Sequence, residues 1–159
     1  MAHGIFRGDN VTSITDPAKI RTIQVYADID NGAPITLGAL AASGKYAREA
    51  EVFTTATANG AAAANVWVVT TPEIDYTNYA LEDFFNANGA ISRAIAMEKY
   101  DIFSVTSEVL SETPDTSDKK YLAAGDGVWT VSNSSSRVFA QYLGSDVQDG
   151  VRFYAFEVL

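Results

Sequence analysis

The 159-residue chain contains no cysteine and a single histidine, His3. Without thiols it has no cysteine nucleophile, no disulfide framework and no Cys-ligated zinc or iron–sulfur cluster. One imidazole near the N-terminus offers little for base-assisted serine chemistry, and we expect it to be exposed with no neighbour that organises it. These absences predict a protein that is not an enzyme, with no catalytic residue, no cofactor and no metal site.

Basic residues are also scarce. The chain has 11 Lys and Arg against 20 Asp and Glu, which gives a net charge of −9. Nucleic-acid affinity depends largely on neutralising phosphates, and the one basic doublet is Lys119-Lys120. The sequence therefore predicts neither a nucleic acid nor a membrane surface as partner, and an acidic exterior that keeps the subunit from associating before assembly.

Long apolar runs are missing as well. Residues 1–9 lack a basic region followed by about 7–15 apolar residues, so no signal peptide is expected. Residues 52–72 carry no charge and match a membrane helix in length, but they include several threonines, Pro72 and a central Asn59-Gly60 pair. Asn-Gly is a strong hairpin signal, so this stretch predicts a β-hairpin.

What the chain has in quantity is hydrophobic and aromatic residues. Hydrophobic residues make up 47% of it, and it contains eight Phe, eight Tyr and two Trp. A chain of this length falls within the usual size of one domain, about 100–200 residues. Composition and length therefore predict a single folded domain with a substantial core.

The apolar pattern is mostly of period two. In residues 22–29, Ile23, Val25, Ala27 and Ile29 alternate with polar or amphipathic residues, which is typical of a half-buried strand. Further strands are predicted at 66–69, 101–106, 127–131 and 150–159. Asn-Gly-Ala triplets at 31–33, 59–61 and 88–90 predict turns. The expected fold is mainly β: a single-domain antiparallel barrel or sandwich.

Helix is expected in one place. Residues 79–87 predict a short helix that ends at Asn88-Gly89, whereas residues 39–50 are ambiguous because Gly44 interrupts an alanine-rich run. The first 20 residues contain Gly4, Gly8 and Pro17 and show no period. The sequence thus predicts an extended N-terminal arm over 1–20 and a β-rich globular domain over 21–159.

Two apparent ligand motifs fail on spacing. Residues 38–45 resemble a phosphate-binding loop but have five residues between the glycines and Tyr46 after the lysine. Residues 28–32 resemble the start of a calcium loop, but Asn31 and Gly32 each come one position early. A strand that runs into a turn explains the second pattern.

Two further groups keep other functions open. Carboxylate pairs for glycoside hydrolysis are available at Glu73/Asp75, Glu82/Asp83 and Glu108/Glu112, although 20 acidic residues make some pairs inevitable. Trp67 and Trp129 suggest a sugar-binding platform, but both lie within apolar strand patterns and are expected to anchor the core. A carbohydrate- or receptor-binding module and a small carboxylate-based cell-wall hydrolase therefore stay open as functions.

A set of short segments carries a family resemblance. They are 81–86 (Leu-Glu-Asp-Phe-Phe-Asn), 88–90 (Asn-Gly-Ala), 93–94 (Arg-Ala), 100–106 (Tyr-Asp-Ile-Phe-Ser-Val-Thr) and 108–110 (Glu-Val-Leu). Together they resemble small structural proteins of tailed bacteriophages, especially those encoded beside the major capsid protein. In that family a G-D-x-F-S-V-T strand follows an Arg-containing strand and leads to a variable loop and two closing strands. Here Tyr100 replaces the glycine.

The resemblance implies a capsid decoration or cement protein. It would be made in the host cytoplasm and would bind the outer capsid surface of the virion, with the major capsid protein as partner and self-association, for example as a trimer. The partner-binding residues expected in the arm are Ile5, Phe6, Arg7 and Ile14. Either a partner surface buries the apolar Ile5, Phe6 and Ile14, or the arm folds back on its own domain. In such a particle, the carbohydrate- or receptor-binding module that is the alternative would be associated with the tail.

Overall fold

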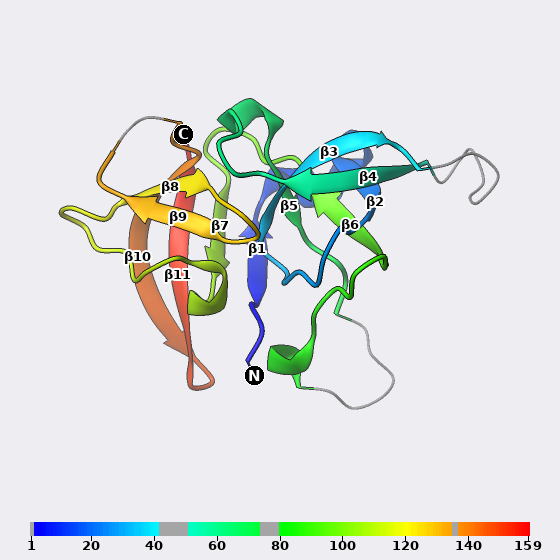
Figure 1. Ribbon diagram of the computed structural model, residues 1–159. Helices are drawn as coiled ribbons and strands as arrows, with labels where there is room; N and C mark the ends of the chain where they lie inside the picture. The colour runs from blue at the N-terminus through cyan, green and yellow to red at the C-terminus, as the bar shows by residue number, and fades with distance from the viewer. Residues whose placement is uncertain (1, 42–50, 74–79, 135–136) are drawn as a thin grey trace.

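The computed structural model describes residues 2–41, 51–73, 80–134 and 137–159 (Figure 1). These residues form eleven strands and several 3-10 turns, with no α-helix among them. The 3-10 turns are Thr12–Thr15, Pro17–Lys19, Ala63–Asn65, Leu81–Asp83 and Ser107–Val109. No helix in this part of the chain is long and apolar enough to span a membrane. The predicted fold class, mainly β, is confirmed.

Five strands close into a barrel, in the order β2-β4-β3-β5-β6. They are β2 (Ile20–Gln24), β3 (Pro34–Leu40), β4 (Val52–Thr57), β5 (Trp67–Val69) and β6 (Ile91–Ile95). The β2–β4 pair is parallel and the other pairs are antiparallel. Fully buried β-branched side chains, which suit a pleated interior, fill the barrel: Ile23, Ile35, Val68 and Ile95.

The other six strands form an antiparallel sheet beside the barrel, in the order β1-β7-β11-β10-β8-β9 (Figure 1). They are β1 (Phe6–Asn10), β7 (Ile102–Val105), β8 (Tyr121–Ala124), β9 (Trp129–Ser132), β10 (Ala140–Gln148) and β11 (Val151–Val158). Along β11, Tyr154, Phe156 and Val158 are buried while the residues between them are not. The sheet therefore has one face on the core and one face outward.

Barrel and sheet share one hydrophobic core. Trp129 of β9 is fully buried, and its Nε1 donates a hydrogen bond of 2.7 Å to the carbonyl oxygen of Gly32, beside the barrel. Gly32 has a φ of +86°, and a Cβ at this position would lie 2.8 Å from Cγ1 of Val105. Only glycine permits both that conformation and that approach.

The hairpin predicted over residues 52–72 does not form. Gly60 has the positive φ (+72°) expected of a turn, but β4 and β5 are not paired with each other, because β3 lies between them and pairs with both. Residues 58–66, which include the Ala63–Asn65 turn, carry the chain across the end of β3. Asn59-Gly60 is therefore a local turn within a longer connection, and β4 and β5 run in the same direction because both are antiparallel to β3.

The helix predicted over residues 79–87 is a single 3-10 turn, Leu81–Asp83, in its described part. Asn86 forms a β-bridge with Ile29, and its Nδ2 donates to the carbonyl oxygen of Ile29 and to Oδ1 of Asn31, at 3.1 and 3.2 Å. These bonds hold the backbone extended where a helix would continue. Of the ambiguous segment 39–50, residues 42–50 lie outside the described part.

The N-terminal segment folds back on its own domain, which was one of the two expected alternatives. Strand β1 pairs with β7, with Phe6 opposite Val105 and Arg7 opposite Ser104. The amide of Thr12 donates a 3.0 Å bond to Oδ1 of the buried Asp101. Residues 6–10 are thus an edge strand of the sheet.

Candidate functional site

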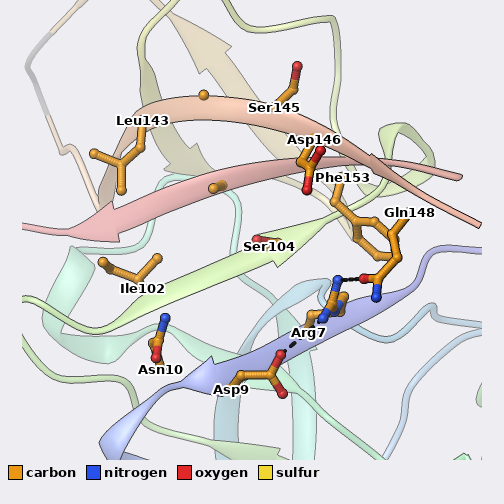
Figure 2. A pocket seen from close by; sticks show the side chains of 12 residues that line it. Arg7, Asp9, Asn10, Ile102, Ser104, Leu143, Ser145, Asp146, Gln148 and Phe153 are labelled. Atoms are coloured by element: carbon orange, nitrogen blue, oxygen red, sulfur yellow. Dashed lines mark hydrogen bonds and ion pairs between the residues drawn. The ribbon is translucent and has the colours of Figure 1, made fainter.

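The outer face of the six-stranded sheet carries a shallow hollow of about 360 Å³ (Figure 2). Strands β1, β7, β10 and β11 all contribute to it, and they come from the two ends and the middle of the chain. The alternation of strand side chains produces this face, since every second residue points away from the core.

Small side chains form the floor of the hollow. Gly144 lies opposite Ala155, Ala155 opposite Ser104, and Ser104 opposite Arg7, so one cross-strand row runs over all four strands. The register of β10 shifts between Tyr142 and Gly144, as at a β-bulge. A Cβ at Gly144 would meet no atom within 4 Å. The row is therefore an open trough between larger neighbours.

Larger side chains flank the trough on both sides, along the direction of the strands (Figure 2). Leu143, which is 49% exposed, and Ile102 lie on one side. On the other side the Arg7 guanidinium lies 5.2 Å from the ring centre of Phe153 and donates hydrogen bonds to Gln148 and to Asp9. These contacts hold the long side chain of Arg7 against the sheet.

This combination suits contact with another protein. Protein interfaces use aromatic, aliphatic and arginine side chains as anchors inside a polar rim. Phe153, Leu143 and Arg7 supply such anchors, and Asp9 and Asp146 supply polar groups at the rim. The backbone beneath them is rigid because β11 is paired on both sides.

The four predicted partner-binding residues are not together on this face. Ile5 is buried, 6% exposed, and its amide donates to Oγ1 of Thr106 at 3.1 Å. Phe6 and Ile14 are half-buried against the core. Arg7 alone reaches the trough, because it alternates with Phe6 along β1.

The sequence analysis did not identify residues of the last two strands, β10 and β11, as part of the site. Phe153 and Ala155 belong to the outward row of β11. The period-two pattern of residues 150–159 contained a signal for them, because the residues between the buried Tyr154, Phe156 and Val158 must face outward.

The single histidine does have organising neighbours, so the expectation of an isolated His3 is wrong. Its Nδ1 lies 2.7 Å from Oδ1 of Asp30, and its ring stacks on Phe85 at 4.7 Å between centres. Asp30 also accepts a 2.8 Å bond from the amide of Gly4. Residues 28–32 thus tie the N-terminus to the barrel. The described residues contain no group of three or more acidic or histidine side chains placed to hold a metal ion.

The two tryptophans differ. Trp129 is fully buried and anchors the core as predicted, so it is not a sugar platform. Trp67 is half-buried, with the Arg21 guanidinium 5.5 Å from its ring centre.

The carboxylate pairs are scattered. Glu82, Asp83 and Glu108 are exposed, and Glu112 forms an ion pair with Lys119. Glu73 is half-buried, and its partner Asp75 lies outside the described residues.

Comparisons with known protein families, with curated protein sequences and with solved structures find no match to this chain. The functional conclusion therefore rests on its own residues and geometry.

Proposed function

We propose that this chain is a structural protein of a tailed-bacteriophage virion, which binds the outer capsid surface as a decoration or cement protein. Its partner is the major capsid protein. The protein is made in the host cytoplasm and is then located on the capsid surface. The observation that carries the proposal is the open outer face of the six-stranded sheet, where Arg7, Leu143 and Phe153 surround a small-residue trough.

The size of this protein is compatible with such a role. A stable contact buries about 800 Å² on each partner, roughly a tenth of the 8515 Å² that this chain exposes. The outer face can supply that area with little conformational cost, since paired strands do not need to become ordered on binding.

The turn before β7 supports the family resemblance. Tyr100 occupies the position of the family's glycine and has a φ of +75°, a conformation that glycine adopts freely. Asp101, the next residue of the motif, is 3% exposed and accepts hydrogen bonds from the amides of Thr12 and Glu98. Asp101 therefore has a structural role in this chain, because it holds the segments around Thr12 and Glu98 together.

A free strand edge supports self-association. Strand β8 pairs with Ala140 and Gln141 of β10, and the amide of Tyr142 donates to the carbonyl oxygen of Lys120, so the edge of residues 143–148 has no strand partner within the described part of the chain. Such an edge can pair with a strand of a second copy.

Counting copies in purified particles tests the proposal. Quantitative mass spectrometry of heads and tails, separated from the same preparation, is expected to find this chain on heads in a fixed ratio to the major capsid protein. A known tail protein serves as the control for separation. Recovery with tails, in a few copies per particle, would contradict the capsid proposal and favour the recognition-module alternative.

A further inference from the structure

A second hollow, of about 200 Å³, lies between the N-terminal segment and the barrel, away from the trough. Phe6, Gly8 and Ile14 form one side of it. The other side is polar and comes from three separate segments: Asn31, residues 70–73 and Arg93. Its volume is below the roughly 300–1,000 Å³ typical of drug-sized ligands, so it suits one small chemical group.

Arg93 brings an uncompensated positive charge into this cavity. Its side chain is half-buried, and its Nε donates a 2.8 Å hydrogen bond to the carbonyl oxygen of Thr70. No carboxylate pairs with it among the residues that the structure describes. Burial lowers the pKa of the Arg93 guanidinium, which nevertheless stays charged at neutral pH. A partly desolvated cation of this kind is stabilised by an anion.

Asn31 organises the cavity. Its Nδ2 donates to Oε1 of Glu73 and to the carbonyl oxygen of Thr71, both at 2.9 Å, and its Oδ1 accepts from the amide of Thr71 at 3.0 Å. Asn31 is 2% exposed, so these bonds are shielded from water. Glu73 and the Thr70–Thr71 backbone are thus held in place before any ligand arrives.

We propose that this cavity binds a single carboxylate, which pairs with the Arg93 guanidinium. A planar carboxylate matches the two parallel N–H groups of a guanidinium. Glu73 disfavours a more highly charged anion, because like charges repel across the cavity. The carboxylate is either a free small acid or an Asp or Glu side chain of a bound protein.

Glu73 makes the site sensitive to pH. Arg93 and Glu73 are the two titratable residues that line the cavity. Burial raises the pKa of Glu73, and a bound anion raises it further, so binding takes up a proton. A protonated Glu73 can also donate a hydrogen bond to the ligand. The affinity for a carboxylate is therefore expected to rise as the pH falls.

An NMR titration of the full chain with sodium acetate, at constant ionic strength, tests the site. The amide signals of Thr70, Thr71 and Arg93 are expected to shift, with a Kd of roughly 1–10 mM, as suits so small a ligand. Arg93→Gln is expected to weaken binding at least about tenfold, the effect of losing a charge-assisted pair. Arg152→Gln, at an exposed arginine outside the cavity, is the matched control and should bind as the wild type does.

Two further arms complete the experiment. Glu73→Gln removes the like charge that lines the cavity, so it should tighten acetate binding at neutral pH and remove the pH dependence, which keeps the site testable even if Arg93→Gln fails to fold. A capped peptide with one glutamate that competes with acetate assigns the site to a protein side chain, whereas acetate binding without competition assigns it to a free acid. Acetate binding that is unchanged in both Arg93→Gln and Glu73→Gln, or phosphate binding as tight as acetate binding, would overturn the proposal.

Discussion

The barrel and the sheet use the same secondary structure in different ways. Each barrel strand is paired on both sides, so the barrel has no free edge. The sheet has edges at β1 and β9, a partly free edge along β10 and an uncovered outer face. Since free edges and open faces are where β-proteins meet other chains, we propose that the sheet supplies the binding surface, whereas the barrel stabilises the fold.

The side chains differ in the same way. The barrel interior is filled by aliphatic residues such as Ile23 and Ile95, whereas the inner face of the sheet carries rings. Phe103 lies 5.8 Å from Phe156 and 6.1 Å from Trp129 between ring centres. These rings pack in the core that the sheet shares with the barrel, and a buried aromatic side chain removes about 150–250 Å² from solvent.

The largest expected change in stability is the difference between substitutions on the buried face and on the outward face of β11. Phe156→Ala removes a fully buried ring and is expected to lower the free energy of unfolding by about 3–5 kcal/mol. Phe153→Ala, three positions away on the outward face, should cost less than about 1.5 kcal/mol. Urea unfolding of both variants measures the difference, and equal losses would show that the outer face is part of the core.

The next effect concerns the attachment of β1. Asp101 accepts bonds from the Thr12 amide and hydroxyl at 3.0 and 2.8 Å and from the Glu98 amide at 2.8 Å. Asp101→Ala leaves these donors without their acceptor and is expected to cost about 2–3 kcal/mol. Because the loss is local, amides of β1 should exchange with solvent faster than those of β6. Equal acceleration in β1 and β6 would contradict a separately attached edge strand.

A smaller effect depends on pH. Burial raises the pKa of Glu73, so the folded protein keeps this proton to higher pH than the unfolded chain does. The contribution of Glu73 to the free energy of unfolding is therefore fully present below the pKa of the unfolded chain. It is lost as the pH rises through the raised pKa of the folded protein. Glu73→Gln should remove this loss and stabilise the protein by less than about 1 kcal/mol at neutral pH, since solvent screens a half-exposed group. Thermal unfolding at about pH 4 and pH 7 measures it. A gain at pH 4 that equals the gain at pH 7 would contradict the role of Glu73.

The smallest effect is at Tyr100. A left-handed conformation costs an L-residue about 1–2 kcal/mol, and glycine avoids this cost but loses about 0.5–1 kcal/mol of chain entropy. Tyr100→Gly is therefore expected to stabilise the sheet by about 0.5 kcal/mol, as measured by urea unfolding. Tyr100→Ala removes the exposed ring but keeps the strain, so it should give no gain. A gain of the same size for Ala would show that loss of the ring, and not of strain, is the cause.

Local features of the fold were predictable from the sequence. The alternation in residues 22–29 identified Ile23 and Val25 as core residues, and the apolar pattern around Trp129 identified it as an anchor. The glycines of all three Asn-Gly pairs have positive φ, as turn glycines do.

Strand pairing was not predictable in the same way. Strand β2 pairs in parallel with β4, and β3 separates β4 from β5, although β2 and β3 are neighbours in sequence, as are β4 and β5. Tertiary fit decides such pairings, and turn signals do not carry that information.

The candidate site depends even more on register. The row of Arg7, Ser104, Ala155 and Gly144 aligns four strands from distant parts of the chain, and a slip of one residue in any strand would turn its side chain inward. The cavity at Arg93 likewise requires Asn31, Thr70 and Glu73 to meet. Composition and spacing contain no signal that the residues of the trough, or those of the cavity, come together in the fold.

The most direct test of the separate roles of barrel and sheet is cosedimentation with capsids that lack this chain. Ala155→Glu places a charged side chain on the trough floor, and Ala56→Glu places the same side chain on an exposed position of barrel strand β4. Both variants should fold, as circular dichroism can verify. We expect the Ala56→Glu protein to sediment with capsids as the wild type does and the Ala155→Glu protein to stay in the supernatant. Retention of the Ala155→Glu protein on capsids would contradict the assignment of binding to the sheet.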